Sequence, residues 1–236
     1  MSSRLADRVA LITGASRGIG AAVARRFAGE GAHVILVART VGGLEAVDDD
    51  IQAAGGSATL VPLDLMDGPG IDRLGGVIAE RWGRLDVLVG NAGVLGVLGP
   101  LAHLKPEVWD EVMAINLTAN WRLIRSMDPL LRAAPAGRAI FVSSGAAARA
   151  KAYWGAYAVT KAALEMLAQT YAAEVVKTHV KVNLIDPGPT RTAMRAAAMP
   201  GEDPQDLPAP EEVTDLFVDL AQPAWGRTGE VIRFRD

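Results

Sequence analysis

Short runs of aliphatic and β-branched residues recur along the chain, and longer stretches with polar positions separate them. Each short run has the length and composition of a buried strand. The predicted strands are Val9–Thr13, His33–Ala38, Ala58–Leu63, Leu85–Val89, Ala139–Val142, Val180–Ile185 and Glu230–Phe234. The stretches between them predict helices over residues 21–28, 41–54, 70–82, 106–131 and 211–220, and another that contains Tyr157 and continues to about Val176.

Strands that alternate with helices form parallel sheets with right-handed crossovers. The pattern therefore predicts an α/β fold, Rossmann-like and doubly wound, with a mostly parallel seven-stranded sheet and helices on both faces. The length of 236 residues suits a single domain over residues 1–236, without a linker or repeat. Residues 193–210 are rich in Ala, Met, Pro and acidic residues, which is typical of a lid over a substrate pocket and equally of a surface loop.

A glycine-rich turn, Thr13–Gly20, follows the first predicted strand and precedes the first helix. This arrangement binds a pyrophosphate, because glycines allow close approach of the backbone and the helix N-terminus offers free N–H groups. The spacing is Gly-x-x-x-Gly-x-Gly, which differs from the commoner dinucleotide fingerprint. The turn predicts a dinucleotide site.

The end of the second strand indicates which dinucleotide binds. In NAD sites an acidic residue about 20 positions after the glycine turn takes the ribose hydroxyls. Here Ala38 and Arg39 occupy that region, and the first acidic residue is Glu45. Arg39, together with Arg17 in the glycine turn, favours a 2′-phosphate. The alternative is that both arginines are solvated surface charges.

Polar residues follow the other predicted strands. Asp64, Asn91 and Ser144 each come at or just after a strand end. Because parallel strands end at one edge of the sheet, these residues, the glycine turn and Arg39 should meet there, where such sheets bind ligands.

Tyr157 and Lys161 are four residues apart, so one helix face should carry both. A positive neighbour favours the phenolate and would lower the pKa of Tyr157 from its reference of about 10. Ser144, 13 positions earlier at the end of a strand, could reach the same substrate oxygen. The group predicts a proton donor with a supporting hydrogen bond.

Asn116 lies in the apolar segment MAINLTA, where asparagine is a poor mid-helix residue. A buried contact and a local opening for water both explain it, and both interpretations stay open.

Composition narrows the function. The absence of cysteine excludes disulfides and thiolate chemistry, and the three histidines lie far apart, so no metal site is expected. A formal charge of −3 without a basic run argues against nucleic acid as a partner. Apolar runs are too short to span a membrane and the N-terminus does not resemble a signal peptide, so a cytoplasmic protein is expected.

Taken together, these motifs resemble the short-chain dehydrogenase/reductase family in its single-domain form. The resemblance covers Val9 to about Phe234. It rests on TGASRGIG, Asp64, the NAG of Asn91–Gly93, Asn116, Ser144, YAVTK and PGPTRT, in family order at family-like intervals.

The resemblance implies a catalytic tetrad. Tyr157 would be the acid/base at the reacting oxygen, and Ser144 would hydrogen-bond that oxygen. Lys161 would bind the nicotinamide ribose and lower the pKa of Tyr157. Asn116 would support a water that links Lys161 to solvent.

The resemblance also implies the cofactor contacts. The phosphates and adenosine would contact Gly14, Ser16, Arg17, Gly18 and Ile19, with Arg39 at the 2′-phosphate. The adenine would border Asp64 and Leu65, and its ribose Asn91, Ala92 and Gly93. The nicotinamide amide would contact Pro187, Gly188, Thr190 and Thr192.

The function implied is an NADP(H)-dependent oxidoreductase that interconverts a carbonyl and a secondary alcohol without a metal, as a homotetramer or dimer. An epimerase or dehydratase on the same fold is one alternative, and a non-catalytic NADP(H)-sensing regulator is another. The substrate stays open among an acyl carrier, a sugar, a steroid and a small ketone. Its pocket is expected along residues 94–98, 146–154 and 193–210, near Arg149 and Lys151.

Two departures from the family pattern stand near the site. Gly90 replaces the first asparagine of the common Asn-Asn-Ala-Gly, and Tyr153 is a second tyrosine. Position 157, four residues after Tyr153, is not a lysine, so only Tyr157 meets the pattern.

Overall fold

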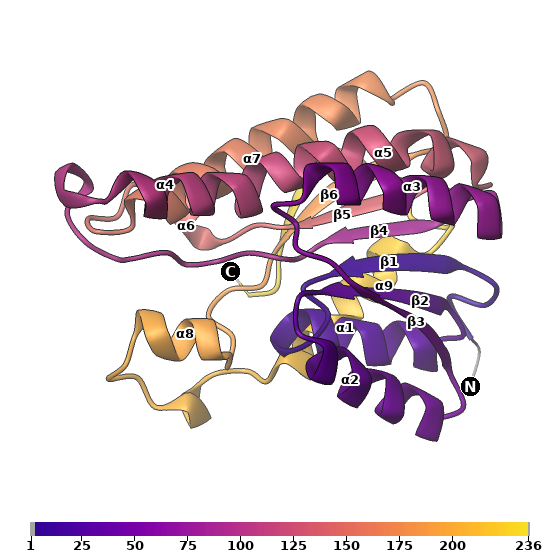
Figure 1. The fold of residues 1–236 in the computed structure, drawn as a ribbon, viewed down its shortest axis with the longest axis horizontal. Helices are drawn as coiled ribbons and strands as arrows, with labels where there is room; N and C mark the ends of the chain where they lie inside the picture. The colour runs from indigo at the N-terminus through magenta and orange to yellow at the C-terminus, as the bar shows by residue number, and fades with distance from the viewer. Residues whose placement is uncertain (1–2, 236) are drawn as a thin grey trace.

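A parallel sheet forms the centre of the computed structural model, which describes residues 3–235 (Figure 1). Its seven strands have the order β3-β2-β1-β4-β5-β6-β7, and every neighbouring pair is parallel. The strands are β1 (Val9–Thr13), β2 (His33–Ala38), β3 (Ser57–Pro62), β4 (Val87–Gly90), β5 (Arg138–Val142), β6 (Lys181–Asp186) and β7 (Val231–Arg233). The predicted Rossmann-like fold is therefore confirmed, and the described sheet is wholly parallel.

Burial explains the composition of the strands. All residues of β1, β4 and β5 are buried, as expected for central strands covered on both faces. The edge strands β3 and β7 have no fully buried residue. The sheet reverses its order between β1 and β4, which is where ligands bind in doubly wound folds.

Helices cover both faces of the sheet, as Figure 1 shows. On one face lie α1 (Gly18–Gly29), α2 (Val41–Ala53) and α9 (Thr214–Ala221), and on the other lie α3 (Gly68–Trp82), α5 (Ala119–Ala133) and α7 (Gly155–Glu174). Each face has its own apolar core. Phe27 and Phe217 belong to the first core, and Phe141 and Met127 to the second.

The single helix predicted over residues 106–131 is wrong in detail. It consists of α4 (Pro106–Met113), a π-helical turn (Ala114–Thr118) and α5. The π turn contains Asn116, whose buried side chain bonds to a neighbouring loop. The helix predicted over 211–220 begins instead as a 3₁₀ turn (Pro210–Val213) before α9. Most other boundaries differ from prediction by one to three residues, as element ends commonly do.

The segment 193–210 contains a short helix, α8 (Ala193–Ala198), and a 3₁₀ turn (Pro204–Asp206). It stands apart from the helix layers in Figure 1. Thr192 caps α8 by accepting a hydrogen bond from Arg195 N, and Arg195 forms a two-pronged ion pair with Glu202. The segment therefore has an ordered structure of its own.

The remaining short elements are a 3₁₀ turn (Leu101–His103) and α6 (Gly145–Ala148). No helix among residues 3–235 is long and apolar enough to cross a membrane.

Candidate functional site

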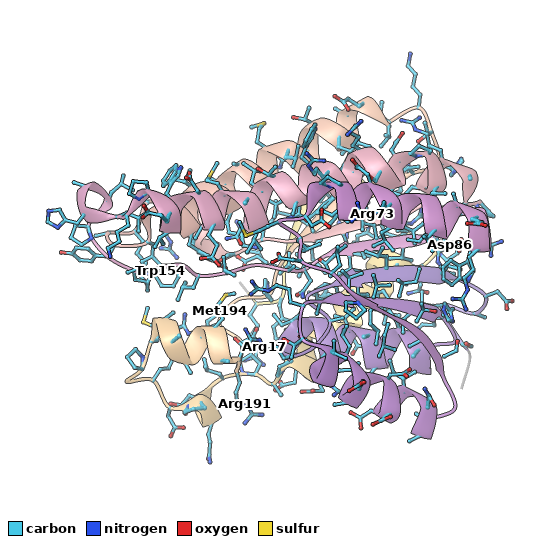
Figure 2. The ribbon with its side chains drawn as sticks, viewed as in Figure 1. Arg17, Arg73, Asp86, Trp154, Arg191 and Met194 are labelled. Atoms are coloured by element: carbon cyan, nitrogen blue, oxygen red, sulfur yellow. The ribbon has the colours of Figure 1, made fainter. Side chains whose placement is uncertain are left out.

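The predicted site residues lie at the carboxyl-terminal edge of the sheet. Gly14 follows β1, Arg39 follows β2, Asn91 follows β4 and Ser144 follows β5. Figure 2 shows Arg17 on the side of the molecule where α8 lies, whereas Asp86, just before β4, lies at the opposite end. The expected convergence on one edge is present.

The glycine turn is too crowded for side chains. Gly14 and Gly18 have φ angles of 66° and 57°, which favour glycine. A Cβ atom added at Gly20 would collide with the carbonyl oxygen of Gly14. Arg17 is the N-cap residue of α1, and its side chain makes no capping hydrogen bond to the helix. The first N–H groups of α1 are therefore open to an anion.

The loop after β4 is pinned to the glycine turn. Thr13 Oγ1 accepts hydrogen bonds from the backbone N–H groups of Asn91 and Ala92, both at 3.0 Å. Asn91 Nδ2 donates to Thr13 O at 2.8 Å. Thr13 was not among the predicted site residues, although its position directly before Gly14 marks it. These bonds hold the two halves of the predicted dinucleotide site in register.

Arg17 and Arg39 lie on neighbouring segments. A Cβ atom added at Gly43, in the first turn of α2, would lie 2.9 Å from Ser16 Cβ, so α2 packs against the glycine turn. Both arginines are exposed, and neither has an ion-pair partner among residues 3–235. The first turn of α2 contains no acidic residue.

Next to them, Asp64 Oδ1 accepts a hydrogen bond from Met66 N at 3.0 Å. Leu65 is buried in the same core that Ala92 contacts. Leu65 and Ala92 therefore pack on the same face of the sheet.

Tyr157 and Lys161 are both buried on α7, with 8% and 3% of their surfaces exposed. Lys161 Nζ lies 5.7 Å from the centre of the Tyr157 ring and donates to Val142 O at 2.7 Å. A Cβ atom at Gly93 would lie 3.7 Å from Lys161 Nζ. The structure therefore brings α7, the end of β5 and the Asn91–Gly93 loop together.

Burial determines the ionisation of this pair. Burial raises the pKa of Tyr157, because a phenolate loses its hydration. The Ser144 hydroxyl acts in the opposite direction, and the negative charge of Asp186 raises the pKa further. Burial also lowers the pKa of Lys161 to about 8. The expected fall in the pKa of Tyr157 is wrong for this structure, because desolvation outweighs the hydrogen bond from Ser144.

Asn116 is fully buried and supports the loop after β4. Its Oδ1 accepts from Val94 N at 2.8 Å, and its Nδ2 donates to Val94 O at 2.9 Å and to Thr160 Oγ1 at 3.1 Å. Thr160 in turn donates to Tyr157 O at 2.8 Å. Asn116 therefore ties the loop to the helix of Tyr157. Of the two interpretations of Asn116, the buried contact is present.

Asn120 explains why position 90 is glycine. Its Nδ2 donates to Asn116 O at 2.9 Å, and its Oδ1 occupies the space that a Cβ atom at Gly90 would need. Sequence reasoning missed both Thr160 and Asn120, whose only signal is a polar residue in an otherwise apolar helical stretch.

The segment after β6 forms a turn beside the glycine turn. Gly188 has a φ angle of 65°, and its N–H donates to Asp186 Oδ1 at 3.0 Å. Thr190 Oγ1 donates to Pro187 O at 3.2 Å. A Cβ atom at Gly18 would lie 3.5 Å from Thr192 Cγ2, so the start of α8 borders the predicted phosphate site. Asp186 was not predicted as a site residue. The sequence did contain a signal for it, namely an acidic residue at the end of a strand and directly before Pro-Gly.

Comparisons with known proteins point to one family. The family model for short chain dehydrogenases matches residues 8–203. The uncharacterized oxidoreductase YciK of Escherichia coli is 40% identical over 217 residues, which cover 91% of this chain and 86% of that protein. A short chain dehydrogenase from Pseudomonas syringae has a TM-score of 0.96 at 39% identity, over 99% of this chain and 96% of that chain. Another from Shigella flexneri, complexed with NADP, has a TM-score of 0.95 at 38% identity and covers 99% of both chains.

Proposed function

Because the chain belongs to the short-chain dehydrogenase/reductase family, we propose that it is an NADP(H)-dependent oxidoreductase that interconverts a carbonyl and a secondary alcohol. Membership of this family shows that the chain is an oxidoreductase that uses a nicotinamide cofactor. Our proposal adds the choice of NADP(H) and the interconversion of a carbonyl and an alcohol. The observation that carries it is the meeting of Tyr157, Lys161 and Ser144 beside the glycine turn, at one edge of the sheet.

The residues present suit this cofactor. The open N–H groups of α1 and the glycines that exclude side chains leave room for a pyrophosphate. Exposed Arg17 and Arg39 offer two guanidinium groups for a 2′-phosphate, and no carboxylate in the first turn of α2 opposes them. The relative from Shigella flexneri is complexed with NADP, which agrees with this choice.

The protein's part in the reaction is to manage a proton. When bound, the nicotinamide supplies or accepts the hydride. Tyr157 would protonate the carbonyl oxygen in reduction and take the proton from the alcohol in oxidation. Ser144 would hold the same oxygen by a hydrogen bond. The raised pKa keeps Tyr157 protonated near neutral pH, and a charged Lys161 would favour the phenolate after proton release.

We propose a supporting role for Asn116. Gly93 separates it from Lys161, since a Cβ atom there would lie 3.3 Å from Asn116 Oδ1 and 3.7 Å from Lys161 Nζ. Both side chains therefore lie close to Gly93, and Asn116 would hold a water that links Lys161 to solvent. Its bonds to Val94 and Thr160 would fix the position of that water.

The substrate would enter between α8 and the segment 146–154. We propose residues 193–210 as the lid, because α8 begins at Thr192, beside the glycine turn. Across from it, Lys151 Nζ lies 4.4 Å from the centre of the Trp154 ring. The pKa of Glu202 in the lid is lowered mainly by its hydrogen bond with Arg195, and the charge of Lys151 adds a smaller effect. Figure 2 shows Trp154 and Met194 on the two sides of this region.

We also propose a single-domain chain that assembles as a homotetramer or dimer. Trp121 on α5, and Val159 and Met166 on α7, are exposed large apolar side chains on adjacent helices. Such faces commonly form interfaces between identical subunits. The domain, residues 1–236, includes Met1, Ser2 and Asp236, which lie outside the described residues. The cytoplasmic location expected from the sequence stays a prediction.

The proposal is tested by oxidation of NADPH in the presence of a panel of carbonyl compounds. Consumption of NADPH that requires one of the carbonyls supports it. An epimerase or dehydratase would convert substrate without net loss of NADPH, and a sensing regulator would bind NADPH without any turnover. Either result would contradict the proposed reaction.

A further inference from the structure

Asp186 places a carboxylate at the edge of the sheet where the nicotinamide contacts are proposed. It is the last residue of β6 and directly precedes Pro187 and Gly188. Only 7% of its surface is exposed. A Cβ atom at Gly145, next to Ser144, would lie 3.5 Å from Asp186 Oδ2. The carboxylate therefore lies between the Ser144 turn and the Pro187–Gly188 turn.

The two oxygens of this carboxylate have different surroundings. Oδ1 accepts the Gly188 N–H at 3.0 Å, which shapes the turn. Oδ2 has no hydrogen-bond donor among residues 3–235, and its nearest cation is Arg233 Nε at 4.0 Å. Arg233 lies opposite Asp186 on the neighbouring strand β7, and half of its side chain is exposed. Because the hydrogen bond that shapes the turn uses only Oδ1, the negative charge at Oδ2 is largely uncompensated.

A carboxylate in this position distinguishes the two redox forms of the cofactor. The nicotinamide ring is a cation in NADP⁺ and neutral in NADPH, while the rest of the molecule is the same. A nearby negative charge attracts the cation and leaves the neutral ring unaffected. The carboxylate also acts on Tyr157, because burial is the main cause of the raised pKa of that phenol and the charge of Asp186 adds to it.

We propose that Asp186 makes the protein favour NADP⁺ over NADPH, and that Arg233 limits this preference. The inference rests on the proposed function, because that function places the nicotinamide beside Pro187 and Gly188. Asp186 acts here as a specificity-determining residue for the redox state of the cofactor, and it gains this effect from the same position that shapes the turn.

Isothermal titration calorimetry of the full chain with NADP⁺ and with NADPH gives the ratio Kd(NADPH)/Kd(NADP⁺). Asp186→Asn keeps an acceptor for the Gly188 N–H and removes the charge. Asp186→Asn should therefore lower the ratio by about threefold or more. This is the change in affinity expected when the attraction between two unit charges roughly 6 Å apart in water is lost. Arg233→Ala removes the compensating charge and should raise the ratio by about twofold, because Arg233 is half-exposed. Asp49→Asn, an exposed acid on α2, should leave the ratio unchanged.

Opposite shifts in the two variants support the inference, since general damage to the site would weaken both forms of the cofactor equally. A ratio that stays constant in Asp186→Asn and Arg233→Ala, while both cofactors still bind, overturns this inference and leaves the proposed function intact. Failure of the wild-type protein to bind either form contradicts the proposed function itself, and the inference with it. If Asp186→Asn does not fold, the rise expected in Arg233→Ala decides the question.

Discussion

Lys161 directs its ammonium group at the carbonyl oxygen of Val142, 2.7 Å away, and not at the phenol of Tyr157. The lysine is thus anchored to the end of β5 and carries a charge that burial disfavours. Its pKa is lowered to about 8 for this reason. The geometry makes Lys161 a group that loses its proton readily, next to a tyrosine that keeps its own.

The buried lysine predicts a pH-dependent stability. Because the pKa of Lys161 is lower in the folded chain than in the unfolded chain, the unfolded chain binds more protons between about pH 8 and pH 10.5. The free energy of unfolding of the wild type should therefore rise relative to that of Lys161→Met over this range, by about 3 kcal/mol. Urea denaturation of both proteins at pH 7 and pH 10.5 measures the difference. A constant difference would show that the ammonium carries no burial penalty.

Arg39 predicts the choice of cofactor. A charge-assisted hydrogen bond contributes roughly 1.5–3 kcal/mol, so Arg39→Ala should reduce the preference for NADPH over NADH by about tenfold or more. The measurement is kcat/KM with each cofactor. Arg73→Ala is the control, because Arg73 is an exposed arginine on α3 that pairs with Asp67.

Equal or better use of NADH by the wild type would contradict the proposed NADP(H) specificity. A preference that survives Arg39→Ala intact would assign the 2′-phosphate to Arg17.

The exposed apolar face of α5 and α7 predicts an oligomer. Met166 is 64% exposed on α7, so a charge there should be tolerated by the fold and should weaken association. Light scattering at micromolar concentration should give a dimer or tetramer for the wild type and a smaller species for Met166→Glu. Val77→Glu, at a 55% exposed position on α3, should keep the wild-type mass. A monomeric wild type would refute the assembly.

Arg138 lies far from the site, and its removal should destabilise the fold. Its buried guanidinium donates to the carbonyl oxygens of Gly137, His179, Gln222, Pro223 and Trp225. Burial, with a smaller contribution from Arg8, lowers its pKa to about 10. Gly137 O and Gln222 O keep a backbone donor in Arg138→Ala, whereas the carbonyl oxygens of His179, Pro223 and Trp225 lose theirs. The substitution should cost about 3–5 kcal/mol. Arg132→Ala, at an exposed ion pair, should cost less than about 1 kcal/mol. Urea midpoints measure both, and similar losses would contradict the role of Arg138.

Much of the fold can be predicted from the sequence because it depends on local patterns. The runs Val9–Thr13 and His33–Ala38 coincide with β1 and β2, since continuous burial selects continuous aliphatic residues. The position of the site follows in turn, because parallel strands end at one edge.

What the sequence does not reveal depends on contacts between distant residues. The π turn at Asn116 arises beside Val94, 22 positions away, which helical periodicity cannot register. The pKa of Tyr157 depends on its burial and on Asp186, so the spacing of Tyr157 and Lys161 alone predicted the wrong direction. Arg138 similarly has no local signal for the carbonyl groups that it binds.

The most direct test of the proposed function is the turnover of Tyr157→Phe. The ring keeps its packing against Trp154, 5.9 Å away between ring centres, so fold and NADPH binding should persist. Without the hydroxyl there is no acid at the substrate oxygen, and kcat should fall by about 10²–10⁴-fold on whichever carbonyl the wild type reduces. NADPH affinity, measured on the same preparation, should change less than about threefold. An unchanged kcat would exclude Tyr157 as the proton donor and contradict the proposed mechanism.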